Sequence, residues 1–354
     1  MVLSPSSDRI FTTRGTLIES THLVHAAITS SSGDLLYTVG NASRPTLLRS
    51  SVKPAQTLAI LEACRSDPTI SFSTADLALM SASHSSEPRH VSRAAAMLEA
   101  VGASESDLEC GGHAALSAGV NREWIKRDFI PGGLCNNCSG KHAGMLAGAK
   151  ALGAGFAGYH LPSHPMQERV KRVVEEVAGL PGGEDVQWAV DGCNLPAPAM
   201  PLSAMAGMYA RFAGAVESPR GARGEDMKRI FEAMYTHPEL VGGEGRFCTQ
   251  LMDAYGGLLI GKLGADGCYG IGVRESEFTK RLGVQSGGVG IAVKVEDGNI
   301  DMLYAAVMDI LAQLDIGEES VRTGLQGWHS PPILNTMGVV TGRVSHSIIV
   351  RKEK

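Results

Sequence analysis

The stretch VHAAITSSSGDLLYTV (residues 24–39) contains two apolar runs separated by a short polar connector. Val24–Thr29 and Leu35–Val39 have the composition of strands, and the five residues between them are serine, glycine and aspartate, which favour turns. Because a connector this short joins antiparallel neighbours, the stretch predicts a β-hairpin. A hairpin near the start of the chain counts against a Rossmann-type fold, whose strands are parallel.

The segments after this hairpin alternate between helical and extended patterns. Pro54–Ala63 (PAQTLAILEA) has proline in its first turn and helix formers after it, which predicts a helix. Further helices are predicted over 92–101, 144–152, 167–177 and 300–314, and strands over 269–273 and 288–295. The segment 76–81 fits either a short strand or the start of a helix.

Hairpins at both ends of the chain with helices between them predict an α+β fold, in which an antiparallel sheet is flanked by helices. We expect a single catalytic domain over residues 1–354, with two lobes and an active site between them as the alternative arrangement.

The composition narrows the class of protein. Hydrophobic residues make up 44% and charged residues 19% of the 354 residues, as in ordinary soluble globular proteins. The net charge is −5, and the chain has no long run of acidic or basic residues. Nucleic acid and anionic membranes need a basic protein surface, so we exclude both as partners. No apolar segment approaches about 18 residues and the N-terminus lacks a signal peptide, so we expect a soluble, cytoplasmic protein. The seven cysteines, an odd number, favour free thiols or a metal over disulfides.

Ser50 and Lys53 form the only Ser-x-x-Lys sequence in the chain. Residues three apart share a face of a helical turn, so the Lys53 amine can reach the Ser50 hydroxyl and act as its base. That role requires an uncharged amine near pH 7, which burial or a second cation promotes. Pro54 disfavours the helical conformation of Lys53, and so short a motif also arises by chance, so a purely structural role stays open.

A second dense cluster is CNNCSGKH (residues 135–142). Its C-x-x-C sequence is typical of a zinc or redox pair, although the second C-x-x-C of a zinc ribbon is missing. Cys193 and Cys248 are further possible ligands. Cys135 fits a buried small hydrophobic residue. His142 follows Cys138 by one helical turn, so a cysteine–histidine nucleophile pair is an alternative.

Together these segments resemble the class 3 L-asparaginases, a family whose fold is similar to that of serine β-lactamases and the related glutaminases. The similarity runs from about Arg14 to Gly342. The motifs that carry it occur in the same order in the chain and are RSSVKPAQ (49–56), ASHSSE (82–87), NCSGKH (137–142), DGCNLP (191–196), GEGR (243–246), GKLGAD (261–266) and VEDGN (295–299).

The resemblance implies a set of site residues. The two catalytic serine–lysine pairs that it implies are Ser50 with Lys53 and Ser83 with Lys262. The ligands that it implies for one zinc ion are Cys138, Lys141 and Cys193, with water completing the coordination and Asp191 close by. Cys248 is expected near the same pocket, and a homodimer is implied.

The expected reaction is the hydrolysis of L-asparagine to L-aspartate and ammonia. Ser50, deprotonated by Lys53, is expected to attack the side-chain amide and form an acyl-enzyme. By position, Arg49 and Asp191 are candidates for binding the substrate α-carboxylate and α-ammonium groups, and zinc is expected to support substrate binding rather than the chemical step.

Three alternatives stay open at this stage. A glutaminase differs by one substrate methylene, which a pocket discriminates weakly. A β-lactamase-like serine hydrolase would usually carry Lys-Thr-Gly, whereas this chain has Lys262-Leu263-Gly264. A zinc-stabilised scaffold or redox sensor would use Cys135 and Cys138 and leave the serines without a role.

Overall fold

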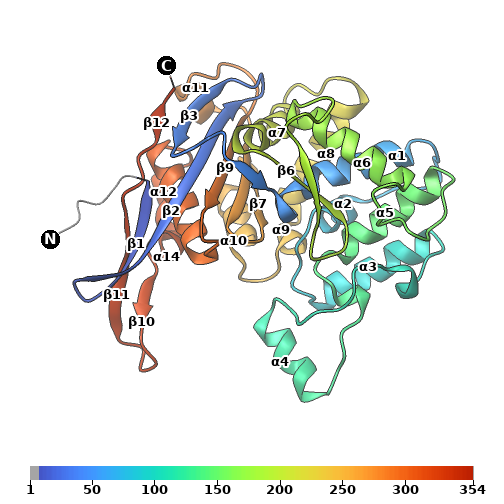
Figure 1. The fold of residues 1–354 in the computed structure, drawn as a ribbon, viewed down its shortest axis with the longest axis horizontal. Helices are drawn as coiled ribbons and strands as arrows, with labels where there is room; N and C mark the ends of the chain where they lie inside the picture. Colours follow the sequence, from blue (N-terminus) through green and yellow to red (C-terminus); the bar gives the residue numbers. More distant parts are fainter. Residues whose placement is uncertain (1–7, 354) are drawn as a thin grey trace. The chain divides into compact units, whose positions relative to one another are not determined.

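The computed structural model describes residues 8–353, which fall into two compact units (Figure 1). Within the described part, unit 1 contains residues 8–48, 200–217 and 254–353, and unit 2 contains residues 49–199 and 218–253. The expectation of a single catalytic domain stays a prediction. No helix in residues 8–353 has the length and apolar character needed to cross a membrane.

Unit 1 is built on an antiparallel sheet. The strands of this sheet are β1 (Arg9–Arg14), β2 (Leu17–Ser30), β3 (Leu35–Val39), β7 (Leu259–Gly264), β8 (Cys268–Val273), β9 (Val289–Val295), β10 (Pro332–Leu334), β11 (Val340–His346) and β12 (Arg351–Lys352). Unit 1 also contains β4 (Pro45–Leu47), which is not part of this sheet. The order in the main sheet is β10-β11-β1-β2-β9-β8-β7, and β3 pairs with both β2 and β12. The helices of this unit are α7 (Leu202–Gly214), α11 (Glu277–Arg281), α12 (Ile300–Gln313), α13 (Glu319–Gly324) and α14 (Gln326–His329).

The hairpin predicted at residues 24–39 is confirmed. Ala26 pairs with Val39 and Ala27 with Thr38, both antiparallel. The first strand is longer than predicted and begins at Leu17, because β1 pairs with its first half and β9 with its second half. The strands predicted at 269–273 and 288–295 are confirmed as β8 and β9. Figure 1 also shows β1 from one end of the chain beside β11 from the other.

Helices α7 and α12 pack against opposite faces of this sheet. A Cβ atom added to Gly270 would lie 2.1 Å from the Tyr209 ring, and one added to Gly290 would lie 1.8 Å from the Ala206 carbonyl oxygen, so glycine lets α7 approach the backbone of β8 and β9. The neighbouring Tyr269 points the other way, and its ring contacts Tyr304 of α12 edge-on. The hydrophobic residues between these layers form the core of unit 1.

Unit 2 is mainly helical. Its elements are η1 (Arg49–Val52), α1 (Lys53–Cys64), α2 (Thr74–Met80), α3 (Pro88–Ala100), η2 (Glu105–Asp107), α4 (Ala118–Lys126), η3 (Gly133–Cys135), α5 (Ser139–Ala151), α6 (Pro165–Ala178), β5 (Gln187–Val190), α8 (Gly221–Thr236) and α9 (Pro238–Val241), and β6 (Pro196–Pro201) and α10 (Phe247–Tyr255) begin in it. Strand β5 pairs antiparallel with β6.

Helices α1 and α5 form the centre of unit 2. Every residue of α1 is buried, and it packs against α5, α6 and α8. Most residues of α1 are apolar, as expected for a helix buried on all sides, and its buried polar side chains are Lys53, Gln56, Thr57 and Glu62. A Cβ atom added to Gly144 of α5 would lie 2.4 Å from the Met80 sulfur, so this glycine allows close packing of α2 on α5.

The predicted helices 54–63, 92–101, 144–152, 167–177 and 300–314 are confirmed as α1, α3, α5, α6 and α12. The ambiguous segment 76–81 is a helix: α2 begins after Ser73, whose hydroxyl accepts a hydrogen bond from the Asp76 N–H while the Asp76 carboxylate accepts one from the Ser73 N–H. This capping box, Ser-x-x-Asp, was a signal in the sequence that the prediction did not use. The α+β class with an antiparallel sheet is confirmed.

Candidate functional site

The Ser50–Lys53 motif lies where a 3₁₀ turn becomes a helix. Arg49 has a φ of 51°, which is uncommon outside glycine and turns the chain sharply before Ser50. Val52 has helical φ and ψ, so η1 continues into α1, and Lys53 is helical despite the proline that follows it. Ser50 is half-buried and Lys53 is completely buried. The serine is therefore partly accessible from outside, whereas the lysine is enclosed.

The Lys53 amine contacts the segment that follows α2. Its Nζ donates a hydrogen bond to the Ala82 carbonyl oxygen and another, of 3.1 Å, to Ser83 Oγ. The family resemblance implied that Ser83 pairs with Lys262, and it did not predict the hydrogen bond between Lys53 and Ser83. Thirty positions separate these two residues, so no local spacing could have indicated the contact.

The segment Ser83–Glu87 is buried and held by hydrogen bonds. The Ser83 N–H donates to the Val241 carbonyl, Ser85 Oγ donates to the Gly242 carbonyl, and Ser86 Oγ donates to the Cys135 carbonyl. Fixed on both sides in this way, the segment positions the Ser83 hydroxyl next to Lys53.

His84 belongs to the same network and is uncharged. Its Nδ1 accepts from the Ser86 N–H, so its Nε2 carries the proton and donates to Ser139 Oγ at 2.9 Å. Burial, followed by the positive charges of His90 and Lys53, holds the pKa of His84 well below its usual value. His84 therefore connects the Ser83 segment to the start of α5 as a neutral hydrogen-bonding group.

Cys138, Lys141 and Cys193 converge within unit 2 and are all buried. Cys138 precedes α5, Lys141 lies in its first turn, and Cys193 lies in the turn after β5. Lys141 Nζ donates to Cys193 Sγ at 3.1 Å, and the Cys138 thiol is shared between Asn137 Oδ1, at 3.1 Å, and Cys193 Sγ. We call these three residues the thiol–amine cluster.

The thiol–amine cluster holds separated charges. The hydrogen bond from Cys138 and the charge of Lys141 keep the pKa of Cys193 well below its usual value despite burial, while the same hydrogen bond and burial raise the pKa of Cys138 to about 12. Burial alone would lower the pKa of Lys141, but the negative charge of the thiol pair outweighs it and raises that pKa. These shifts favour the thiolate form of Cys193 and the ammonium form of Lys141.

The donor set fits the zinc ion that the family resemblance implies. Two sulfurs and one amine nitrogen face one another in a buried site, and the electrostatics favour the thiolate form of Cys193. Because a lysine ligand must be deprotonated, zinc binding would release the Lys141 proton. Zinc as a cofactor stays a prediction.

Arg49 and Asp191 form an ion pair between Arg49 Nε and Asp191 Oδ1 at 2.7 Å. Burial favours the protonated form of Asp191, but the charges of Lys141 and Arg49 outweigh it and hold the pKa of Asp191 below its usual value. Asp191 also accepts from the Gly192 N–H. The ion pair joins the turn that carries Ser50 to the turn that carries Cys193, so the structure brings the two motifs of unit 2 together.

The alternative of a Cys138–His142 nucleophile pair is not supported by the electrostatics. The His142 Nδ1 lies 2.6 Å from the Tyr159 hydroxyl, and burial together with the charge of Lys141 lowers the pKa of His142 to about 3. An activated pair needs a thiolate beside an imidazolium. Here His142 is neutral and the Cys138 thiol keeps its proton.

The remaining predicted residues are Lys262, in unit 1, and Cys248, in unit 2. Lys262 is completely buried in β7 of unit 1 and donates to the Leu263 carbonyl oxygen at 2.8 Å. Cys248 is buried in α10, in unit 2. All seven cysteines are free thiols, and Cys135 is buried as the sequence suggested. The roles of Lys262 and Cys248 stay predictions.

A comparison with protein families gives one match over most of the chain. The family model described as L-asparaginase II matches residues 10–346, a range that includes every candidate site residue named above. No curated protein matches this chain.

Proposed function

Because this chain belongs to the L-asparaginase II family, we propose that it hydrolyses the side-chain amide of L-asparagine through a serine acyl-enzyme. The family supports an amidohydrolase of the asparaginase type, as the resemblance to class 3 L-asparaginases implied. The proposed mechanism rests on one observation: the buried Lys53 amine donates a hydrogen bond to Ser83 Oγ at 3.1 Å. Ser50 precedes Lys53 by three positions and lies on the turn that enters α1.

In the acylation step, Ser50 Oγ attacks the amide carbon of the substrate and its proton passes to the Lys53 amine, a step that requires this amine in its unprotonated form. The electron pair of the carbonyl bond moves to the carbonyl oxygen. Backbone N–H groups at the Ser50 turn, which precede the first hydrogen-bonded turn of α1, would stabilise the resulting oxyanion.

The Lys53–Ser83 hydrogen bond supplies a route for the proton to the leaving group. Lys53 returns its proton to Ser83 as the Ser83 hydroxyl protonates the amide nitrogen, and ammonia departs. Water then attacks the acyl carbon and releases L-aspartate, and Ser50 recovers a proton. The family resemblance implies a catalytic role for Lys262 as the partner of Ser83, and this role stays a prediction.

We assign the recognition of the amino-acid part of the substrate to Arg49 and Asp191. In the free protein these two charges neutralise each other. An incoming zwitterion can replace both partners at once, its α-carboxylate binding Arg49 and its α-ammonium group binding Asp191. Cys248 is proposed as a further pocket residue.

Cys138, Lys141 and Cys193 would hold zinc, which when bound supplies a fixed positive charge that orients or polarises the substrate. These three residues and Asp191 position the substrate rather than take its protons. Removing the metal with a chelator should therefore raise KM by about tenfold and leave kcat nearly unchanged. Complete loss of kcat in the chelated protein would contradict the supporting role.

The proposal is tested by removing each serine hydroxyl. Ser50→Ala should keep less than about a hundredth of wild-type turnover of L-asparagine, because losing a nucleophile costs several orders of magnitude. Ser92→Ala removes an exposed hydroxyl from α3 and should keep full turnover. Ammonia release measures the turnover, and a Ser50→Ala protein that keeps more than about a hundredth of wild-type turnover would exclude Ser50 as the nucleophile.

One observation favours a second assignment within the same chemistry. The Lys53 amine is hydrogen-bonded to Ser83, so Ser83 is a competing nucleophile with Lys53 as its base.

Comparing L-asparagine with L-glutamine in the same assay tests the substrate assignment. We expect kcat/KM to favour L-asparagine by about tenfold or more, the discrimination that one methylene allows. A homodimer is also proposed, and light scattering of the intact chain measures it.

A further inference from the structure

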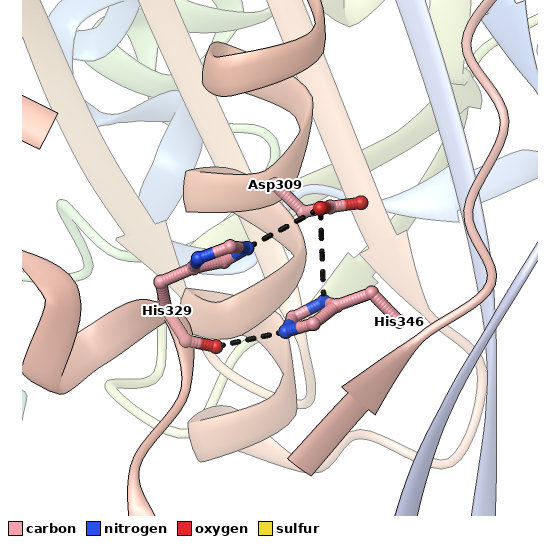
Figure 2. A group of neighbouring side chains, drawn as sticks. All are labelled: Asp309, His329 and His346. Carbon is pink, nitrogen blue, oxygen red and sulfur yellow. Dashed lines mark hydrogen bonds and ion pairs between the residues drawn. The ribbon is translucent and has the colours of Figure 1, made fainter. Parts of the chain in front are cut away.

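Three side chains of unit 1 meet at a place that has no role in the proposed hydrolysis (Figure 2). Asp309 comes from α12, His329 ends α14 and His346 ends β11. A carboxylate oxygen and one nitrogen from each ring lie within 4.8 Å of one another. We call these three residues the imidazole–carboxylate cluster. All three side chains are half-buried.

The spacing of the donor atoms is close to that of a metal site. His329 Nε2 lies 3.2 Å from Asp309 Oδ1, and His346 Nδ1 lies 4.0 Å from the same oxygen. The two rings stack with centroids 4.4 Å apart. Around a tetrahedral zinc ion at about 2.1 Å from each donor, the donors lie roughly 3.4 Å apart. Shifts of less than about 1 Å would therefore close the cluster around an ion.

His346 presents a lone pair to the cluster. Its Nε2 donates to the His329 carbonyl oxygen at 3.0 Å, which fixes the proton there and leaves Nδ1 as the acceptor. Nδ1 is buried and has no hydrogen-bond partner among the described residues. A ligating histidine commonly donates its other ring N–H to a carbonyl in this way.

Asp309 is oriented by a residue on its own helix. Its Oδ2 accepts from Gln313 Nε2 at 2.9 Å, which leaves Oδ1 facing the two rings. Gln313 also donates to the Ile348 carbonyl and accepts from the Val350 N–H. The carboxylate therefore has the outer hydrogen bond that metal-binding carboxylates usually have, and that bond extends to the segment after β11.

We propose that Asp309, His329 and His346 bind one divalent transition-metal ion of the zinc type. Two imidazole nitrogens and one carboxylate oxygen suit zinc, cobalt or nickel, whereas calcium and magnesium prefer oxygen ligands alone. Three protein ligands leave a coordination position for water. The ion would tie α12, α14 and β11 together, so its effect falls on the stability of unit 1.

Cobalt binding tests this proposal in a full-length, untagged protein whose thiol–amine cluster is removed by Cys138→Ser, Lys141→Met and Cys193→Ser. This background protein should bind one equivalent of Co²⁺, with no thiolate-to-cobalt absorption band. Adding His346→Ala should weaken binding at least about tenfold, since one of three ligands is lost. Adding Asp301→Asn, an exposed aspartate on the same helix, should leave binding unchanged.

A stability measurement provides the second readout. Zinc should raise the Tm of the background protein increasingly with free metal concentration, and should not raise that of the His346→Ala protein. Asp309→Asn, which keeps the shape of the side chain, replaces His346→Ala if circular dichroism shows that the latter is unfolded. No cobalt bound to the folded background protein, or equal binding after either ligand substitution, would overturn the proposal.

Discussion

Lys53 and Lys141 are the same residue type in similar positions, but their partners differ. Both are buried, and both lie in the first turn of a central helix of unit 2, α1 for Lys53 and α5 for Lys141. Lys53 donates to a carbonyl and a hydroxyl oxygen, neither of which carries a net charge. Lys141 donates to Cys193 Sγ, whose pKa is held well below its usual value.

The difference teaches that the partner, rather than burial alone, decides what a buried lysine can do. Burial disfavours the ammonium form of Lys141, but the thiol pair outweighs burial and raises the pKa of Lys141. Lys141 is therefore suited to pair with sulfur or, once it loses its proton, to bind a metal. Lys53 faces a hydroxyl that can exchange a proton with it, which suits a catalytic base.

The largest effect should come from replacing Lys53. Lys53→Met keeps the aliphatic stem and removes the amine, so kcat for L-asparagine should fall about 1000-fold, the usual contribution of a general base. Ammonia release at saturating substrate measures this.

Lys171→Met provides the matched control, because it removes an exposed lysine from α6 and should keep wild-type kcat. A Lys53→Met protein that keeps more than about a tenth of wild-type kcat would mean that Lys53 is a structural lysine, since base catalysis is usually worth 100-fold or more.

The second effect concerns the stability of the metal-free protein. Cys138→Ser with Cys193→Ser leaves the Lys141 ammonium group buried without a thiolate, which should lower the free energy of unfolding by about 3 kcal/mol. Urea unfolding in the presence of a chelator measures it. Adding Lys141→Met removes the unpaired charge and should restore part of the loss. If the triple variant is less stable than the double variant, the ion pair is not what holds the thiol–amine cluster together.

The smallest effect concerns His84, the neutral neighbour of Lys53. Its folded-state pKa is below its unfolded value, so the unfolded chain takes up the proton first as the pH falls. The stability that a neutral His84 provides is fully present above about pH 6.5 and is lost below it, with a slope of up to about 1.4 kcal/mol per pH unit. His84→Gln should reduce this slope in unfolding experiments from pH 7 to pH 5. An unchanged slope would assign the acid sensitivity to other groups.

Local sequence signals predicted part of the fold. The turn residues 30–34 gave the first hairpin, and Pro54 with the helix formers after it gave α1. The pairing of β1 with β11 could not be predicted, because it joins strands more than 300 positions apart and depends on the closure of the whole sheet.

The candidate site was predictable where a motif is contiguous. The residues themselves indicated Cys138 and Cys193 as possible metal ligands, but Lys141 joined them only through the family resemblance. The Lys53–Ser83 contact and the imidazole–carboxylate cluster were missed, because each depends on how separate elements pack. Asp309, His329 and His346 lie 20 and 17 positions apart and match no metal-binding spacing.

The most direct test of the central claim is to trap the covalent intermediate. Acid quenching of the enzyme during turnover of L-asparagine, followed by intact-mass and peptide mass spectrometry, should show one added aspartyl group on the peptide that contains Ser50. The Lys53→Met protein should accumulate far less of this species in the first turnover. The aspartyl group on the Ser83 peptide, or no covalent species at any quench time, would contradict the assignment of Ser50 as nucleophile with Lys53 as its base.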